Sequence, residues 1–205
     1  MRGAAGLRIT LGRVRASASI AQISKPDFIA SLDVLLAIYC AAMGANRRDQ
    51  GARLAVMERH AENPGFTALA ARPADDAPIV AFAYAFHGAP GQWWHDVVRG
   101  GLSVAAGTAA ATTWLADPVE VAEVHVSPGY QNQGIGRRMM LMLTAGRPER
   151  TAVLSTQDGN SPAHGLYRSL GFTDLLTSFR FPGSAQPYAV MGAVLPLLDG
   201  RRPGA

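Results

Sequence analysis

The stretch of sequence that decides the fold runs from Val126 to Arg138 and reads Val-Ser-Pro-Gly-Tyr-Gln-Asn-Gln-Gly-Ile-Gly-Arg-Arg. The segment before it, Val119–Val126, is rich in β-branched residues and predicts a strand. The apolar pattern after it predicts a helix over about Gly136–Ala145. The order is therefore strand, tight loop and helix start. Glycines at 134 and 136 let the backbone turn sharply and let a ligand approach its amides closely.

A helix that begins directly after such a loop offers a site for an anion. Its first N–H groups lack acceptors within the helix, and the helix dipole adds partial positive charge there. This combination binds a pyrophosphate well. We therefore expect a phosphate-bearing ligand here, with Arg137 and Arg138 adding charge at the rim. The alternative is that the glycines serve only to make a tight turn between strand and helix.

Two well-known phosphate-binding motifs do not fit this loop. The dinucleotide fingerprint needs a glycine or alanine three residues after Gly136, where this chain has Met139. The phosphate loop of nucleoside triphosphatases needs a lysine directly after a glycine, and Lys25 is the only lysine of the chain. A phosphate-bearing ligand at this loop would therefore belong to another class.

A second motif spans Asn160–Phe172 and reads Asn-Ser-Pro-Ala-His-Gly-Leu-Tyr-Arg-Ser-Leu-Gly-Phe. It predicts a helix at Ser161–Ser169 with an apolar face, capped by Gly171 and followed by a strand. Tyr167 lies next to that apolar face. From the residues alone, a tyrosine there is most simply a core residue with its hydroxyl satisfied.

The rest of the chain alternates between strands and helices, which indicates a mixed α/β fold. The pattern predicts that the strands Phe66–Ala71 and Ile79–Phe86, joined by the polar turn 73–78, form a hairpin. We expect one domain over residues 1–198, with a helical or loop insertion at about 88–116 and a flexible tail at 199–205. Further strands are expected at Leu7–Val14, Ser17–Ile23, Phe66–Ala71, Ile79–Phe86, Thr151–Thr156, Phe172–Phe181 and Tyr188–Val194, and further helices after Pro26 and at Arg47–His60.

Composition narrows the function classes. The chain has 205 residues, of which 48% are hydrophobic and 17% charged, so it can bury a sizeable core. Its net charge of +4 comes without a basic run longer than two residues, which argues against a nucleic-acid partner. The single cysteine, Cys40, excludes an intrachain disulfide, and no histidine pair has metal-binding spacing. Without a signal or membrane-spanning segment in the pattern, we expect a cytoplasmic protein without a membrane partner.

Together the two motifs, V-x-P-x-x-Q-x-x-G-x-G and N-x-x-A-x-x-L-Y-x-x-x-G-F, resemble the GNAT superfamily of acetyl-CoA-dependent N-acetyltransferases. The resemblance is close over residues 119–181, whereas residues 1–87 agree only in the order of elements. It implies a splayed, mixed β-sheet flanked by helices, with acetyl-CoA between the fourth and fifth strands. It also leaves a homodimer open.

The resemblance implies a set of cofactor-binding residues. Backbone groups of Val124, His125 and Val126 would pair with the pantetheine arm of acetyl-CoA. Asn160 would help fix the cofactor or the helix start, and Tyr167 would protonate the leaving thiolate. The pyrophosphate would be held by Gln131 and by the amides of Gln133, Gly134, Ile135, Gly136, Arg137 and Arg138.

The implied reaction is direct attack of an amine on the thioester within a ternary complex. An acceptor ammonium, whose pKa is about 10, must first lose a proton to a base. Glu120 matches the glutamate used by histone-type members of the superfamily, and Glu123 lies nearer the cofactor. Residues three apart point to opposite faces of a regular strand, but a β-bulge, common in this strand of the family, would change that. The choice stays open, as does a solvated strand-edge position for either; Ser155, where some relatives carry a base, cannot serve.

The acceptor side is less determined. Trp93 and Trp94 in the insertion could wall a pocket for an aromatic or cationic amine, or could simply anchor an insertion helix to the domain. The acceptor could be a small molecule, a protein lysine or a protein N-terminus. A catalytically weak acyl-CoA-binding regulatory module is the alternative to an enzyme, and the presence of Tyr167 and both glutamates favours the enzyme.

Overall fold

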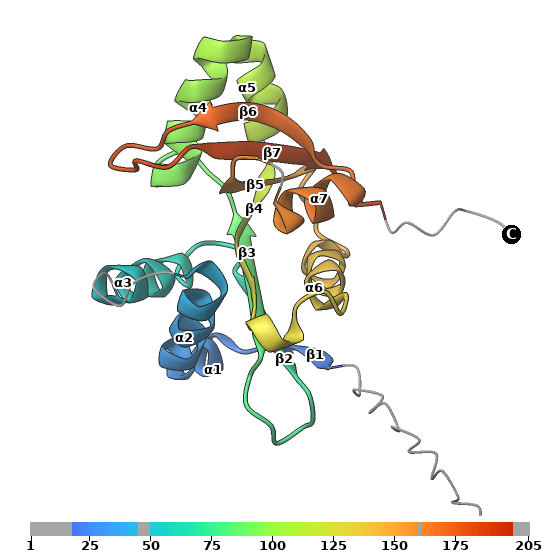
Figure 1. The fold of residues 1–205 in the computed structure, drawn as a ribbon. Coiled ribbons are helices and arrows are strands. Elements are labelled where there is room, and N and C mark those ends of the chain that lie inside the picture. Colours follow the sequence, from blue (N-terminus) through green and yellow to red (C-terminus); the bar gives the residue numbers. More distant parts are fainter. Residues whose placement is uncertain (1–17, 45–49, 160, 199–205) are drawn as a thin grey trace, which may run out of the picture.

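The computed structural model describes residues 18–44, 50–159 and 161–198. They form a seven-stranded sheet in the order β1-β2-β3-β4-β5-β7-β6, with helices on both faces (Figure 1). Strands β4 and β5 run parallel and the other neighbours run antiparallel, so the sheet is mixed, as expected. The predicted strand Leu7–Val14 and the predicted tail 199–205 lie outside the described residues.

The strands agree with the expected ones to within two residues at each end. They are β1 (Ser19–Ile23), β2 (Thr67–Arg72), β3 (Ala81–His87), β4 (Pro118–Val126), β5 (Thr151–Gln157), β6 (Thr173–Phe179) and β7 (Tyr188–Val194). The helices are α1 (Lys25–Ala30), α2 (Leu32–Met43), α3 (Gln50–His60), α4 (Trp93–Ala106), α5 (Thr108–Leu115), α6 (Ile135–Thr144) and α7 (Pro162–Ser169).

The first helical segment is divided into two helices, α1 and α2. The Oγ of Ser24 accepts a hydrogen bond from the Asp27 N–H at 3.2 Å and caps the start of α1. The Ser31 N–H then donates to the carbonyls of Asp27 and Phe28, which closes α1 before α2 begins. Because Phe28 and Leu35 pack into the same core, the apolar spacing runs across the break and does not reveal it.

Helices α1–α3 and α6 cover opposite faces of strands β1–β4. On β3, Phe82, Tyr84 and Phe86 face α1–α3, where they pack with Phe28 and Met57. The intervening positions 81, 83 and 85 are all alanine and face α6. Small residues on that side let α6 approach the sheet closely.

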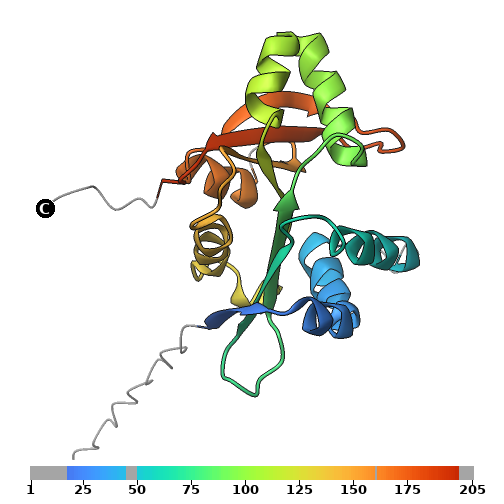
Figure 2. The same cartoon turned by 180° about the vertical axis from the view of Figure 1, so that it is seen from behind.

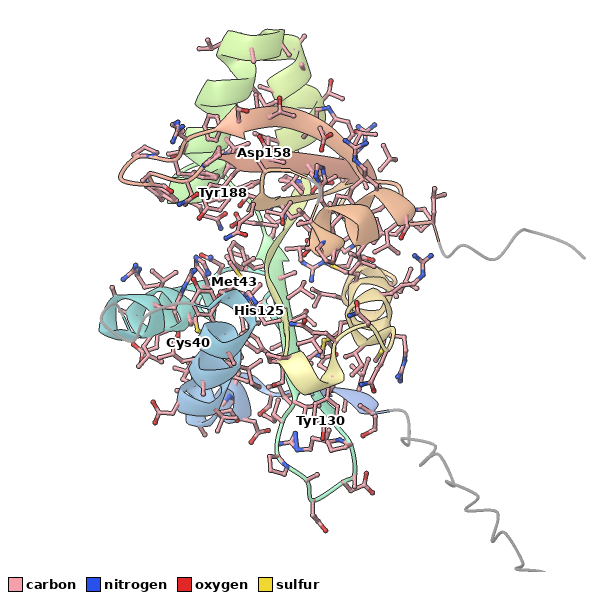
Figure 3. The ribbon with its side chains drawn as sticks, viewed as in Figure 1. Cys40, Met43, His125, Tyr130, Asp158 and Tyr188 are labelled. Carbon is pink, nitrogen blue, oxygen red and sulfur yellow. The ribbon has the colours of Figure 1, made fainter. Side chains whose placement is uncertain are left out.

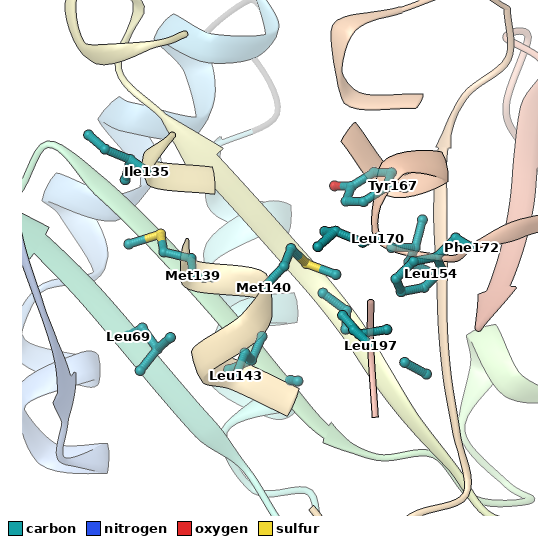
Figure 4. Close-up of a cluster of buried hydrophobic side chains, with 14 of the residues drawn as sticks. Leu69, Ile135, Met139, Met140, Leu143, Leu154, Tyr167, Leu170, Phe172 and Leu197 are labelled. Carbon is teal, nitrogen blue, oxygen red and sulfur yellow. The ribbon is translucent and has the colours of Figure 1, made fainter. Parts of the chain in front are cut away.

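The insertion at 88–116 forms α4 and α5, which pack on β5, β6 and β7 (Figure 2). Trp114 of α5 lies against Gly192 of β7, where an added Cβ would come within 2.8 Å of the Trp114 ring. The other face of these strands is covered by α7. Figure 4 shows that Tyr167 of α7 and Leu170, which follows α7, share one core with Met140 of α6.

The sheet splits between β4 and β5. These strands pair only over Pro118–Glu120 and Thr151–Val153. Beyond that segment, β4 stays with β3 and β5 stays with β7. The sheet is therefore splayed, which confirms the fold expected from the sequence motifs. Each half carries its own helices, and Figure 1 shows the two halves diverging from this point.

Candidate active site

A β-bulge in β4 determines which way the two candidate glutamates point. The register with β3 shifts at this point and leaves Ala122 as an extra residue on β4. Glu120 and Glu123 would face opposite sides of a regular strand, but the extra residue brings both to the same face. His125 shares this face, which is the one covered by α1–α3. Their partners across the ladder are Phe86, Tyr84 and Phe82, respectively.

Glu120 lies at the end of the paired part of β4, opposite Val153 of β5. Its side chain is buried, and its Oε2 atom has no hydrogen-bond partner among the described residues. Burial raises the pKa of Glu120 to about 8. This carboxyl group therefore holds a proton at neutral pH and releases it under mildly alkaline conditions.

Glu123 is equally buried but has both carboxylate oxygens occupied. Its Oε1 lies 2.9 Å from Nη1 of Arg53, and its Oε2 is hydrogen bonded to Nε2 of His125. Burial acts to raise the pKa of Glu123, but the His125 hydrogen bond and the charge of Arg53 outweigh it and hold the pKa below its usual value. Glu123 is therefore an anion at neutral pH.

Tyr167 combines a buried ring with a hydroxyl that faces the split. The ring packs in the core, 5.8 Å from that of Phe172. Figure 4 shows the hydroxyl pointing out of α7 on the side of β4. Burial, with a contribution from the negative charge of Glu123, raises the pKa of Tyr167 to about 12. The phenol thus keeps its proton at neutral pH and can donate it.

The loop after β4 presents uncapped backbone amides. Gly134 adopts the left-handed conformation at φ 75° and begins α6 without a side-chain cap. The N–H groups of Ile135, Gly136 and Arg137 in the first turn have no acceptor within the helix. The Arg138 N–H donates to the Gly134 carbonyl at 3.1 Å. The Arg138 amide is thus the first one that the helix itself uses, and its expected role as a pyrophosphate ligand stays a prediction.

Two glutamine side chains brace this loop from within. Nε2 of Gln131 donates to the Val126 carbonyl at 3.0 Å, and Nε2 of Gln133 donates to the Gly129 carbonyl at 3.2 Å. These bonds shape the turn that exposes the amides. Asn160, which was expected to help fix the cofactor, lies outside the described residues.

The two arginines of the motif tie α6 to its neighbours. Arg137 donates to Ser169 Oγ at 2.9 Å and to the Leu198 carbonyl at 3.3 Å. Arg138 donates to the Ala18 carbonyl at 3.0 Å. A role for these side chains at the rim of a phosphate site stays a prediction.

Beyond Glu120, the β5-facing edge of β4 has no paired strand among the described residues. Val124, His125 and Val126, whose backbone was expected to pair with pantetheine, belong to this edge. Figure 3 places His125 and Met43 on one side of the split and Tyr188 on the other.

The two adjacent tryptophans of α4 differ in environment. Nε1 of Trp94 donates to Ser155 Oγ on β5 at 3.2 Å, so Trp94 helps to anchor the helix. Trp93 is 59% exposed, and its ring lies 5.7 Å from that of Phe181. Only Trp93 thus offers a large apolar surface to a partner.

Arg53 and Tyr39 are site residues that sequence reasoning missed. Both lie on helices that reach β4 only through the tertiary fold, so no local pattern singles them out.

Among the described residues, no group of three or more histidine, cysteine, aspartate or glutamate side chains could hold a metal ion, and no helix could cross a membrane.

The splayed sheet, with an uncapped helix start at the split, has the arrangement that the resemblance to the GNAT superfamily implied, and the comparisons agree. Residues 92–174 match the family model described as an acetyltransferase (GNAT) domain. The chain is 38% identical over 142 residues to the GCN5-like protein acetyltransferase Rv2170 of Mycobacterium tuberculosis, covering 67% of this chain and 69% of that one. The chain belongs to the GNAT acetyltransferase family.

Solved structures share the fold at low identity. The ribosomal-protein-S18-alanine N-acetyltransferase of Escherichia coli is 15% identical, with a TM-score of 0.56 over 90% of this chain and 98% of that one. The PaiA N-acetyltransferase of Thermoplasma acidophilum, solved with coenzyme A, is 14% identical, with a TM-score of 0.52 over 87% and 99%. These likenesses concern the fold alone.

Proposed function

We propose that this GNAT acetyltransferase transfers the acetyl group of acetyl-CoA to a primary amine of a protein, by direct attack in a ternary complex. The observation that carries the proposal is the bulge in β4, which sets Glu120 and Glu123 on one face at the split in the sheet. The negative charge of Glu123 contributes to raising the pKa of the Tyr167 hydroxyl. A proton acceptor and a proton donor thus lie at the same opening.

The cofactor site fits acetyl-CoA, which supplies the activated thioester. The uncapped amides of Ile135, Gly136 and Arg137 would hold its pyrophosphate, since they point along the helix dipole and have no acceptor within α6. The unpaired edge of β4 over 124–126 would bind the pantetheine arm by backbone hydrogen bonds.

We assign the proton acceptor to Glu120. A general base works best when its pKa lies near the operating pH, and the pKa of Glu120 is about 8. Its Oε2 has no partner among the described residues, so it can receive a proton from the acceptor ammonium. Glu123, whose oxygens are both held, serves instead as a fixed negative charge that stabilises the ammonium before it is deprotonated.

We assign the proton donor to Tyr167. When the amine attacks, the carbon–sulfur bond breaks and the sulfur leaves as a thiolate. A buried phenol that is protonated at neutral pH can hydrogen bond to this sulfur and transfer its proton as the bond breaks. The ring is fixed by its packing in the core, which keeps the hydroxyl in place.

A protein acceptor is supported by two features. The mycobacterial relative is described as a protein acetyltransferase. In addition, the exposed Trp93 beside Phe181 gives a polypeptide an aromatic surface next to β5, onto which Trp94 is anchored. A small-molecule amine would need less of this surface.

The test is thiol release from acetyl-CoA across a panel of lysine peptides, N-terminal peptides and small amines. We expect turnover with at least one peptide class, and a fall of about 100-fold or more in kcat for Tyr167→Phe with acetyl-CoA affinity unchanged. Binding of acetyl-CoA without turnover of any acceptor would instead favour a regulatory acyl-CoA-binding module. Turnover with small amines alone would overturn the protein acceptor.

A further inference from the structure

The contacts of Arg53 extend the site to helix α3. The Arg53 guanidinium donates from Nη1 to Glu123 Oε1 at 2.9 Å and from Nη2 to the Tyr39 hydroxyl at 2.7 Å. Its central carbon also lies 4.3 Å from the centroid of the Tyr39 ring, in a cation–π contact. One side chain of α3 therefore contacts both α2 and β4.

His125 completes a closed set of contacts. Its Nε2 is hydrogen bonded to Glu123 Oε2, and its ring meets the Tyr39 ring edge-on, with centroids 5.0 Å apart. We call the four residues Arg53, Tyr39, His125 and Glu123 the Arg53 cluster. Within it, Glu123 is held by α3 through one oxygen and by its own strand through the other.

Stability alone is a poor reason for this arrangement. Replacing a buried ion pair with apolar side chains is often neutral or stabilising, because desolvation offsets much of the attraction. Here the carboxylate is only 8% exposed, yet it is kept ionised on the same face as Glu120. A charge held at a desolvation cost beside the reacting groups is better explained by catalysis, in which fixed charges stabilise the developing ones.

We propose that Arg53 is a positioning residue for acetyl transfer. It acts through Glu123 and His125 and holds the negative charge of Glu123 in place on the acceptor side. It does not contact the acceptor amine. The proposal rests on the acetyl transfer proposed above. It also makes the position of α3 important for the active site, because Glu123 would lose its ion pair with Arg53 if α3 lay farther from β4.

His125 contributes most to lowering the pKa of Glu123, and Arg53 adds to this from α3. Burial lowers the pKa of His60 to about 4, so the second basic group of α3 near Glu123 is neutral at pH 7. Burial raises the pKa of Tyr84 well above its usual value, so that phenol is neutral too. The ionisable groups around Glu123 are Arg53 and His60 on α3, Tyr39 on α2, Tyr84 on β3, Glu120 and His125 on β4, and Tyr167 on α7.

The experiment compares Arg53→Gln with Arg59→Gln, which removes an exposed arginine from the same helix. Two quantities are measured: the kinetic constants over pH, and the titration of the Glu123 carboxyl carbon by ¹³C NMR. We expect Arg53→Gln to lower kcat by about 10- to 100-fold, with KM for acetyl-CoA within about twofold of wild type. The Glu123 titration should move to higher pH. Arg59→Gln should change none of these.

Two further variants keep the proposal testable if Arg53→Gln does not fold. Arg53→Lys keeps the charge but loses one of the two hydrogen bonds, so it should leave the Glu123 titration near wild type while lowering kcat. Tyr39→Phe should raise the Glu123 titration slightly. The proposal is overturned if the titration of Glu123 is the same with and without the Arg53 guanidinium, or if kcat falls equally in Arg59→Gln. The NMR measurement needs no acceptor, so it separates this outcome from failure of the proposed function.

Discussion

Glu120 and Glu123 lie on the same face of one strand, yet their environments drive their pKa values in opposite directions. Burial without a partner raises the pKa of Glu120 to about 8, whereas Arg53 and His125 outweigh burial and lower that of Glu123. Pairs of carboxyl groups separated in this way mark acid–base assignments in active sites. At neutral pH one group can exchange a proton and the other is a permanent charge.

This difference predicts the pH dependence of Glu120→Gln. Wild-type kcat/KM should rise with pH to a plateau, with a midpoint near the pKa of Glu120, about 8. In the variant, kcat/KM should no longer rise in this way and should be lower by about 100-fold or more at the plateau, because the amide group of glutamine cannot accept the proton. Rate profiles from pH 6 to 10 check this, and Glu58→Gln, on the exposed side of α3, is the control. If kcat/KM of Glu120→Gln still rises with pH as in wild type, the base is another group.

The same substitution changes stability in a defined direction. The folded protein holds the Glu120 proton up to about pH 8, whereas the unfolded chain releases it near its ordinary pKa of 4.5. The stabilising effect of the protonated carboxyl is therefore complete below about pH 4.5 and is lost as pH rises through 8. Glutamine stays neutral throughout, so the stability of the variant relative to wild type should increase between pH 5 and 9 in urea denaturation. An unchanged difference over this range would contradict the raised pKa.

Sequence identified both glutamates but could not orient them. Alternation along a strand separates positions 120 and 123, and only the bulge at Ala122 reunites them. A bulge is fixed by pairing with β3 and not by the local sequence, so parity could not settle the choice. Arg53 could not be predicted as a site residue for a similar reason, since its partner Glu123 lies 70 residues away in a different element.

At the scale of elements, α6 illustrates a helix whose start was predictable from the sequence. The loop glycines, the uncapped first turn and the amphipathic helix all follow from residues 126–145, which are contiguous. The side chains of Arg137 and Arg138 were less predictable, because their contacts with Ser169 and Ala18 depend on how α6 packs against distant segments.

The two ends of α6 allow a matched test of cofactor binding. Gly134 before the helix and Gly146 after it both have positive φ, 75° and 67°, and an added Cβ meets no atom within 4 Å at either. Alanine should therefore cost about 1–2 kcal/mol of stability at each position. Only Gly134→Ala should also weaken coenzyme A binding, by about 10-fold, because it disturbs the amides of the first turn. Calorimetric titration of both variants checks this. Equal binding by the two variants would remove the pyrophosphate from the α6 start.

The three tryptophans of the insertion differ in their environments in a way that the sequence did not show. The sequence drew attention to Trp93 and Trp94, but Trp114 is the residue packed between α5 and the sheet at Gly192. Adjacent aromatic residues are conspicuous in a sequence, whereas a lone tryptophan in an alanine- and threonine-rich helix is not. Packing against a glycine on a strand 78 residues later is a tertiary fact.

Alanine at two tryptophans should separate these roles. Trp114→Ala should lower the free energy of unfolding by about 3 kcal/mol, because it leaves a cavity beneath α5. Trp93→Ala should change it by less than about 0.5 kcal/mol, since that ring is 59% exposed, while raising KM for a peptide acceptor several-fold. Thermal denaturation and peptide kinetics on both variants measure the two effects. If KM does not respond to Trp93→Ala, the aromatic surface beside Phe181 is not part of the acceptor site.

At the scale of the molecule, the two halves of the sheet are joined across β4 and β5 by three residue pairs only. One apolar core nevertheless extends through both halves, since α6 and α7 share it (Figure 4). We therefore propose that the described residues unfold as one unit despite the split, and the single domain expected from the sequence stays a prediction. On this proposal, the split would hold a ligand and would not be a boundary between domains.

A ligand that binds in the split should stabilise the folded state of the whole molecule. Because coenzyme A binds the folded state alone, a concentration 100 times its Kd adds about 2.7 kcal/mol to the free energy of unfolding. For a chain of this size, that raises Tm by about 5–10 °C. Hydrogen exchange should slow most at the amides of 121–126 on β4, which have no paired strand on the β5 side, and at the start of α6. Amides of β1 and β2, on the far side of β3, should change little by direct contact. Scanning calorimetry and exchange mass spectrometry with and without coenzyme A check both expectations. A rise in Tm with two separate transitions, or protection confined to β5–β7, would contradict a single cooperative unit with the cofactor held along β4.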